Sequence, residues 1–137
     1  MRYRTLSVLC LAAVVAFSAA ASIALAADPA GEGTRFYMDY RAAFAKAKAI
    51  EEVLPLMAKE RVAQVEKTPK EDRAKMFEMI KMMDVKDVKV TKETKTATGY
   101  TLEATGTGGM GDGPAKGTIT LVREDGKLKL DKESWKN

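Results

Sequence analysis

A run of glycines is the first pattern in this sequence that could support chemistry. Residues 106–111, Gly-Thr-Gly-Gly-Met-Gly, match G-x-G-x-x-G, the spacing that brings a dinucleotide pyrophosphate to a helix N-terminus. Here Asp112-Gly113-Pro114 follows, and then a strand-like alternation, so a phosphate would meet a carboxylate and no helix dipole. We therefore predict a flexible hairpin loop and no cofactor site.

Methionines gather in residues 76–83, and their thioethers are ligands that Cu(I) accepts. The chain has no His, and its one cysteine, Cys10, falls in a segment that we expect to be removed. Methionine is also a common filler of cores and a lining of adaptable apolar pockets. We favour core or pocket lining, keep copper binding as the alternative, and predict no metal site. The methionines concerned are Met57, Met76, Met79, Met82 and Met83.

Asp39, flanked by Tyr37 and Tyr40, is the grouping most like a proton-transfer site, in which a carboxylate works beside a tyrosine. On a helix, however, Asp39 would face away from Tyr40, and an Asp near a helix start is usually solvated. Ser134 is the only serine after residue 26, and without His it has no activating base. We name no catalytic residue, and we keep an isomerase or lyase that uses a buried carboxylate as an alternative function.

The N-terminal segment has the form of a secretory signal peptide. Arg2 and Arg4 precede an uncharged, mostly apolar run that reaches Ala27, and Ala24-Leu25-Ala26 gives the small-x-small pattern of a cleavage site. We expect residues 1–26 to be removed and the protein to be periplasmic or secreted. The alternative is an uncleaved anchor, since residues 6–27 are long enough to span a bilayer. Cleavage would also leave a chain without cysteine, held together by its core alone.

The charge balance excludes one class of partner. Loss of Arg2 and Arg4 reduces the 23 basic residues to 21 against 19 acidic ones, a net charge of +2. Acids and bases are interleaved, as in residues 81–93, which is typical of a solvated surface and not of a nucleic-acid footprint. We expect no nucleic-acid partner, and membrane contact only through the signal peptide during export.

Helical spacing dominates the first half of the mature chain. Residues 27–33 form a lead that we expect to be disordered, and Thr34 could cap a first helix that ends near residues 46–48. A second helical stretch covers about residues 50–66, and Pro55 should break or kink it. Thr68-Pro69-Lys70-Glu71 predicts a capping box for a third helix that runs to about Met83. Its expected buried stripe is Met76, Phe77, Ile80 and Met83.

The second half alternates with the period of strands. Asp125-Gly126 predicts a two-residue hairpin turn, because both positions need a positive φ. Trp135 is out of phase with Leu128 and Leu130, so a bulge near residues 131–134 would be needed to turn it inward. Four strands are expected around Val88 and Val90; Tyr100, Leu102 and Ala104; Ile119 and Leu121; and Leu128 and Leu130.

Helices followed by a meander indicate an α+β fold, with N-terminal helices packed on a curved antiparallel sheet of about four strands, in one domain over residues 34–137. Residues 49–56 (AIEEVLPL), the helix end at Met82-Met83 and the final hairpin of residues 117–135 resemble small exported members of the nuclear-transport-factor-two-like (cystatin-like) superfamily. Leu128 stands where that hairpin often has Trp. The resemblance implies a cone-shaped fold with a pocket between sheet and helices, shallower here because a strand pair between the second and third helices has no room.

That superfamily includes enzymes, ligand binders and dimerisation modules, so the resemblance alone selects no function. We expect a non-catalytic exported protein that binds a small apolar ligand or a protein partner through the pocket or the open sheet face. A structural homodimer, formed sheet to sheet, is a further alternative. The residues expected to line the core and any pocket are Phe36, Tyr40, Phe44, Met76, Phe77, Ile80, Tyr100 and Trp135.

Overall fold

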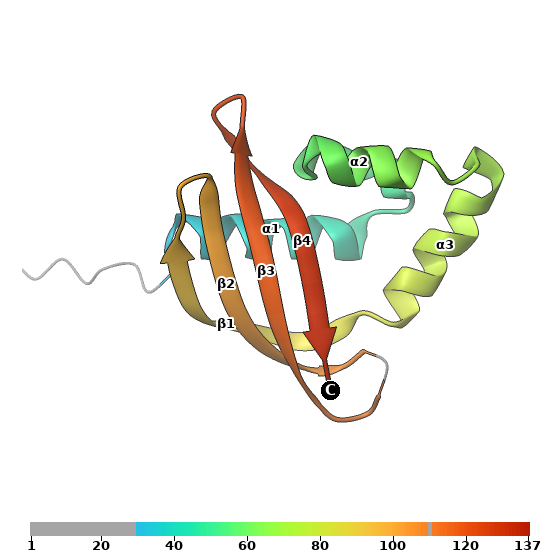
Figure 1. Ribbon diagram of the computed structural model, residues 1–137. Helices are drawn as coiled ribbons and strands as arrows, with labels where there is room; N and C mark the ends of the chain where they lie inside the picture. Colours follow the sequence, from blue (N-terminus) through green and yellow to red (C-terminus); the bar gives the residue numbers. More distant parts are fainter. Residues whose placement is uncertain (1–29, 110) are drawn as a thin grey trace, which may run out of the picture.

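A computed structural model describes residues 30–109 and 111–137, and in them helices precede an antiparallel sheet (Figure 1). The expected signal peptide, residues 27–29 of the expected lead, and Met110 lie outside the described residues. The elements are α1 (Glu32–Lys46), the 3₁₀ turns η1 (Ile50–Glu52) and η2 (Leu54–Leu56), α2 (Lys59–Glu66), α3 (Lys70–Met82), β1 (Val85–Lys95), β2 (Gly99–Gly108), β3 (Pro114–Glu124) and β4 (Lys127–Lys136).

The sheet is an open meander of order β1-β2-β3-β4, in which each strand pairs antiparallel with the next. The α+β class expected from the element order is therefore confirmed. Asp125 and Gly126 form the predicted turn between β3 and β4, with φ of 51° and 77°. In Figure 1, α1 crosses one face of the sheet, while α2 and α3 stand beyond β4 and the chain then returns to β1.

Helix α1 is fixed to the sheet at its first turn. Its N-cap is Gly31, and the carboxylate of Glu93 on β1 accepts hydrogen bonds from the backbone N–H of Gly33 (3.3 Å) and Thr34 (2.8 Å). The Thr34 hydroxyl also donates to Glu93, at 2.6 Å. A distant carboxylate thus supplies the cap, because it satisfies the free N–H groups and opposes the helix dipole. The sequence predicted Thr34 as the cap and a disordered segment up to residue 33. Both predictions were wrong here, because Gly31 is the N-cap and α1 begins at Glu32.

Proline breaks the second helical stretch as predicted. Residues 50–56 form the turns η1 and η2, and the regular helix α2 begins only at Lys59. Between them, Met57 makes a parallel bridge with Leu130, and the Ala58 N–H donates to the Leu130 carbonyl at 2.8 Å. The break therefore lets the chain join β4 before α2 starts, and this places α2 beside that strand.

Helix α3 differs from the prediction at its start and along its face. Pro69 is the N-cap and has no polar side-chain atom that could accept from the helix, while the Thr68 hydroxyl donates to Met76 Sδ instead of capping. The capping box is therefore wrong. Of the expected stripe only Phe77 is buried, because α3 stands at the side of the fold and not across the sheet.

A bulge in β4 sets the inner face of its second half. Leu130 pairs with Leu121, whereas the next pair on β3 is Thr120 with Lys132, so Asp131 is an extra residue. The predicted bulge is confirmed. It places Glu133 and Trp135 on the same face as Leu130, over the buried part of the sheet. The largest fully buried side chains are Tyr37, Val53, Leu102, Ile119, Leu121 and Leu130.

Candidate functional site

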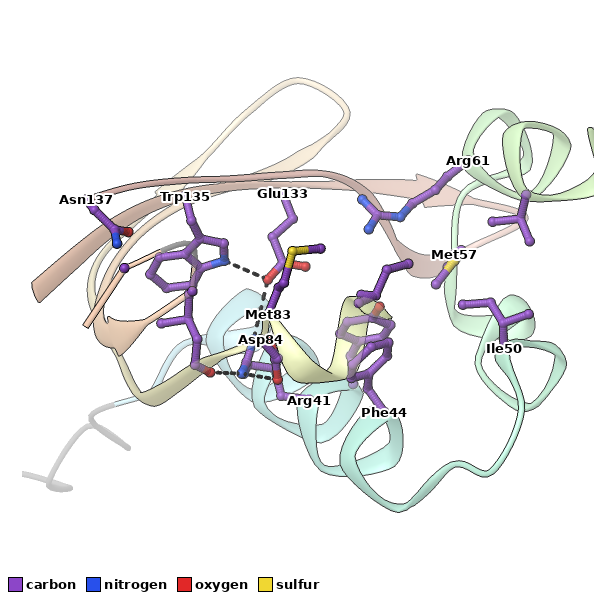
Figure 2. A pocket seen from close by; sticks show the side chains of 16 residues that line it. Arg41, Phe44, Ile50, Met57, Arg61, Met83, Asp84, Glu133, Trp135 and Asn137 are labelled. Carbon is purple, nitrogen blue, oxygen red and sulfur yellow. Dashed lines mark hydrogen bonds and ion pairs between the residues drawn. The ribbon is translucent and has the colours of Figure 1, made fainter. Parts of the chain in front are cut away.

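A cavity of about 520 Å³ lies where α1, α2 and α3 meet the inner face of β4 (Figure 2). Its volume is within the range of roughly 300–1,000 Å³ that is usual for small-molecule sites. Most of its wall is apolar, and one end carries charged side chains. The apolar wall is formed mainly by Phe44, Ile50, Met57, Val65, Ile80 and Met83.

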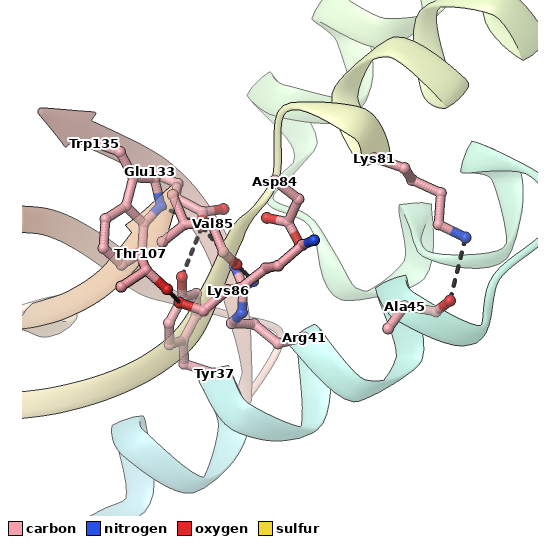
Figure 3. A network of polar contacts seen from close by, with 10 residues as sticks. All are labelled: Tyr37, Arg41, Ala45, Lys81, Asp84, Val85, Lys86, Thr107, Glu133 and Trp135. Atoms are coloured by element: carbon pink, nitrogen blue, oxygen red, sulfur yellow. Dashed lines mark hydrogen bonds and ion pairs between the residues drawn. The ribbon is translucent and has the colours of Figure 1, made fainter. Parts of the chain in front are cut away.

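Glu133 is the centre of the polar end, and Figure 3 shows the groups that converge on it. One of its carboxylate oxygens, Oε1, accepts hydrogen bonds from the Tyr37 hydroxyl (2.6 Å) and the Trp135 indole N–H (2.9 Å). The Arg41 guanidinium lies 3.4 Å from the same oxygen. The Glu133 side chain is only 14% exposed. A carboxylate this buried is stable only with such partners, so the bulge and α1 are held together here by charge as well as packing.

Arg41 joins this end of β4 to the junction between α3 and β1. Its Nη2 atom lies 2.9 Å from Asp84 Oδ2 and also donates to the Val85 carbonyl. Arg41 therefore bridges two carboxylates, one directly before the first strand, β1, and one in the last strand, β4. The guanidinium is suited to this because its donors lie in a fixed plane and point in different directions.

Burial shifts the ionisation of the groups around the cavity. It raises the pKa of Asp84 despite the opposing charge of Arg41. It also raises the pKa of Tyr37, with a further contribution from the charge of Glu133. The same two causes raise the pKa of Tyr40 to about 12. Burial would lower the pKa of Arg41, but Tyr37 and Asp84 outweigh it and the net shift is upward. The tyrosines are therefore neutral donors, and Arg41 is charged, at ordinary pH.

Lys81 fixes α3 against α1 and so holds one wall of the cavity. Its ammonium donates to the carbonyls of Ala45 (3.2 Å) and Ala47 (2.6 Å), which have no partners within α1 because they lie at its end. The same ammonium lies 5.1 Å from the centroid of the Phe77 ring, a cation–π contact. Ile80 and Met83, on either side of Lys81 in sequence, are thereby presented to the cavity.

Four of the eight residues expected to line the core or a pocket do line this cavity: Tyr40, Phe44, Ile80 and Trp135. Phe77 is 2% exposed and packs edge-on against Phe44 in the core. Phe36 is half-buried against the core, and Met76 is half-buried beside Thr68. Tyr100 is also half-buried against the core, away from this cavity, and its hydroxyl donates to Glu32 at 2.7 Å.

The other candidate groups take up different positions. Asp39 is exposed and does not line the cavity. Gly106 and Gly108 belong to β2, and a strand, not a helix, begins at Pro114. The glycine run therefore lies at the β2–β3 hairpin, as predicted, but residues 106–108 belong to strand β2 and not to a loop.

The methionines divide between the inside and the outside of the molecule. Met57 and Met83 line the cavity. Met79 and Met82 are 55% and 78% exposed, so core or pocket lining was wrong for these two. Within the described residues, no group of three or more His, Cys, Asp or Glu side chains is placed to hold a metal ion.

Sequence reasoning missed the charged end of the cavity, which consists of Arg41, Asp84 and Glu133. One signal for Glu133 was present: a bulge that turns Trp135 inward turns Glu133 inward as well, because they are two residues apart. No comparable signal marked Arg41 or Asp84, whose partners are distant in sequence.

No protein-family model, curated protein or solved structure matches this chain. The geometry of the site is therefore the basis for any functional argument. None of the helices in residues 30–109 and 111–137 has the length and apolar character needed to cross a membrane.

Proposed function

We propose that this is an exported, non-catalytic protein that binds a small apolar ligand in the cavity between its helices and sheet. The single observation that carries the proposal is a cavity of about 520 Å³ with a largely apolar wall. Pockets of this size and lining are the usual sites of small-molecule binding. The resemblance to the nuclear-transport-factor-two-like superfamily, which implies a pocket between sheet and helices, supports the same proposal.

The charged end of the cavity also supports binding over catalysis. Arg41, Tyr37 and Trp135 all direct their donors to one oxygen of Glu133, and Asp84 is paired with Arg41. These groups hold one another in place, which suits a rigid, pre-formed site. A pre-formed site binds more tightly because less conformational freedom is lost when the ligand enters.

The test uses protein exported from cells that express the full chain. We expect native mass spectrometry to detect a retained small molecule, or the emission of Trp135, the only tryptophan, to change on addition of an apolar probe such as dodecan-1-ol. Met83→Glu should abolish probe binding by placing a charge on the cavity wall. Met79→Glu adds the same charge to the exposed side of α3 and should not. No retained mass together with an unchanged emission would contradict the proposal and favour a protein partner.

A carboxylate on the wall of an apolar cavity favours one second candidate, an isomerase or lyase that uses Glu133 as a base. Glu133 lines the cavity, whereas Asp39, the grouping noticed in the sequence, does not. Incubation with cyclic ketones in D₂O would test this by deuterium incorporation next to the carbonyl. Incorporation that is lost in Glu133→Gln would establish catalysis. Its absence across the panel would remove this candidate.

Export itself is proposed from the sequence of residues 1–26. The intact mass of the exported protein should correspond to a chain that begins at Ala27, as Ala24-Leu25-Ala26 predicts. A mass that retains these residues would instead indicate the uncleaved anchor. Periplasmic and secreted locations are distinguished by recovery from the envelope or from the medium.

A further inference from the structure

Arg61 is a cation on the cavity wall that the ion-paired cluster does not use. It belongs to α2, is half-buried, and lines the cavity together with Met57 and Val65. Figure 2 shows its side chain reaching from α2 with the guanidinium on the cavity side. No described residue forms an ion pair or hydrogen bond with it. A half-buried guanidinium without a partner is costly, and a ligand anion would offset that cost.

The Tyr40 hydroxyl is a second group without a partner at the same place. Tyr40 is 4% exposed and lines the cavity, and within the described chain its hydroxyl makes no hydrogen bond. No fully buried side-chain oxygen or nitrogen in the described residues lacks a partner. The hydroxyl must therefore reach open space, which for this side chain is the cavity. Arg61 lines the same cavity, and its charge lowers the pKa of Tyr40 against the larger upward effects of burial and of the Glu133 charge.

Within the described residues, none of the other charged side chains of the cavity forms an ion pair with Arg61. Asp84 is paired with Arg41 at 2.9 Å, and Glu133 Oε1 accepts from Arg41, Tyr37 and Trp135. Arg61 and the Tyr40 hydroxyl are therefore donors on the wall of a cavity whose other charged side chains, Arg41, Asp84 and Glu133, are already paired with one another. Val65 lies one turn after Arg61 on α2, and it lines the cavity together with Met57, which precedes α2.

We propose that the ligand is an acidic amphiphile, an apolar chain that ends in a carboxylate. Its carboxylate accepts hydrogen bonds from the Arg61 guanidinium and the Tyr40 hydroxyl, and its chain packs against Phe44, Ile50 and Met57. A guanidinium is the side chain best matched to a carboxylate, because two parallel N–H groups meet its two oxygens. This inference rests on the proposed function, since it assigns a ligand class to the same cavity.

The experiment compares three probes that share one chain and differ in the head group: dodecanoate, dodecan-1-ol and dodecylammonium. Binding to the exported protein is followed by Trp135 emission, below the concentrations at which the probes form micelles. We expect dodecanoate to bind at least about tenfold more tightly than dodecan-1-ol, as hydrogen bonds to a charged group imply. In Arg61→Gln this preference should disappear, so that dodecanoate and dodecan-1-ol bind about equally, while the affinity for dodecan-1-ol stays the same.

Two further variants make the result specific. Lys67→Gln removes one positive charge from the exposed end of α2, outside the cavity, and should keep the preference for dodecanoate. Tyr40→Phe should reduce it by a few fold. Far-UV circular dichroism shows whether each variant is folded, and the dodecan-1-ol affinity provides an internal control in every variant.

The outcomes separate this inference from the proposed function. If none of the probes binds, the proposed function fails. If dodecanoate and dodecan-1-ol bind equally, or if Arg61→Gln keeps the preference, the apolar site stands and the acidic ligand class is wrong. Tighter binding of dodecylammonium would also overturn the inference and would assign head-group recognition to Glu133.

Discussion

Glu133 is the residue on which the geometry of the cavity depends most. Its side chain is 14% exposed, and one oxygen accepts from Tyr37 and Trp135 and faces Arg41. Tyr37 and Arg41 come from α1, and Trp135 comes from β4. If the carboxylate were absent, the Tyr37 hydroxyl and the Trp135 indole N–H would each lose an acceptor in a water-poor place. The cost of leaving such donors unpaired exceeds the net value of the hydrogen bonds themselves.

We therefore expect Glu133→Ala to lower the free energy of unfolding by about 2–3 kcal/mol, through the unpaired donors and the loss of one partner of Arg41. Urea unfolding followed by circular dichroism measures this. Asp39→Ala is the matched control, because Asp39 is exposed, and it should change stability by less than about 0.5 kcal/mol. A Glu133→Ala protein as stable as the wild type would show that the cluster does not support the fold.

Tyr40 provides a test based on pH. Its pKa is raised to about 12, while an unfolded tyrosine ionises near about 10. Above pH 10 the unfolded state has released the proton that the folded state still binds, so this residue makes stability fall as pH rises to about 12. In Tyr40→Phe that part of the fall disappears. Between pH 9 and 11.5 we expect the variant to gain on the order of 1–2 kcal/mol relative to the wild type.

Urea unfolding at several pH values measures this difference, and the two proteins compared between pH 7 and 9 serve as the control, since no tyrosine ionises there. Stability curves that stay parallel up to pH 11.5 would show that the Tyr40 hydroxyl is freely hydrated in the folded protein.

At the scale of elements, the bulge in β4 determines which side chains reach the cavity. Side chains alternate along a strand, so an odd number of extra residues reverses the face of everything that follows. Asp131 is the extra residue, and the bulge absorbs it by placing Asp131 and Lys132 opposite one residue of β3. If the same residues formed a regular strand with no bulge, Glu133 and Trp135 would point to the outer face.

Two deletions test separately the effect of the bulge itself and the effect of which face of β4 the later residues occupy. Removing Asp131 alone should give a regular strand in which Glu133 and Trp135 still face inward, with Trp135 emission close to that of the wild type. Removing both Asp131 and Lys132 should turn them outward, shift the emission to the red and strongly destabilise the protein. Fluorescence and thermal unfolding of the two variants measure this. Equal red shifts in both variants would contradict this expectation. They would show that the local twist of the bulge, and not the face of the strand on which Trp135 lies, keeps its side chain buried.

The sequence was sufficient where structure depends on neighbours in the chain. The alternation of β4, the Asp125-Gly126 turn and the break at Pro55 are local, and each was predicted correctly. The N-terminus of α1 was not, because its cap is the carboxylate of Glu93, about 60 residues away. The burial of α3 was overestimated for a similar reason: its apolar residues are spaced as in a buried helix, but the helix stands beside the sheet. Arg41 and Asp84 likewise meet only in the folded chain.

At the scale of the whole molecule, the two faces of the sheet differ in character. The inner face carries the core and the cavity. The outer face carries mainly Thr, Lys and Glu side chains, and Lys92 and Glu103 form an ion pair across it at 3.5 Å. Charged side chains on a sheet surface oppose association with another sheet. A sheet-to-sheet homodimer, the structural alternative, would have to bury this surface. Its exposed residues include Glu103, Thr105, Lys116, Thr118 and Lys132.

We expect the outer face not to mediate a dimer. A stable interface buries about 800 Å² on each partner, and here that area would include lysines without partners, whose desolvation is unfavourable. Size-exclusion chromatography at two concentrations 100-fold apart should therefore give the same elution for the wild type and for Thr118→Lys, which adds a charge at the centre of this face. Ala63→Lys, which adds the same charge on an exposed position of α2, is the control. A dimer that Thr118→Lys dissolves and Ala63→Lys leaves intact would contradict this expectation and establish the sheet as an interface. A dimer that neither variant affects would place the interface on the helical side, where Met79 and Met82 are exposed.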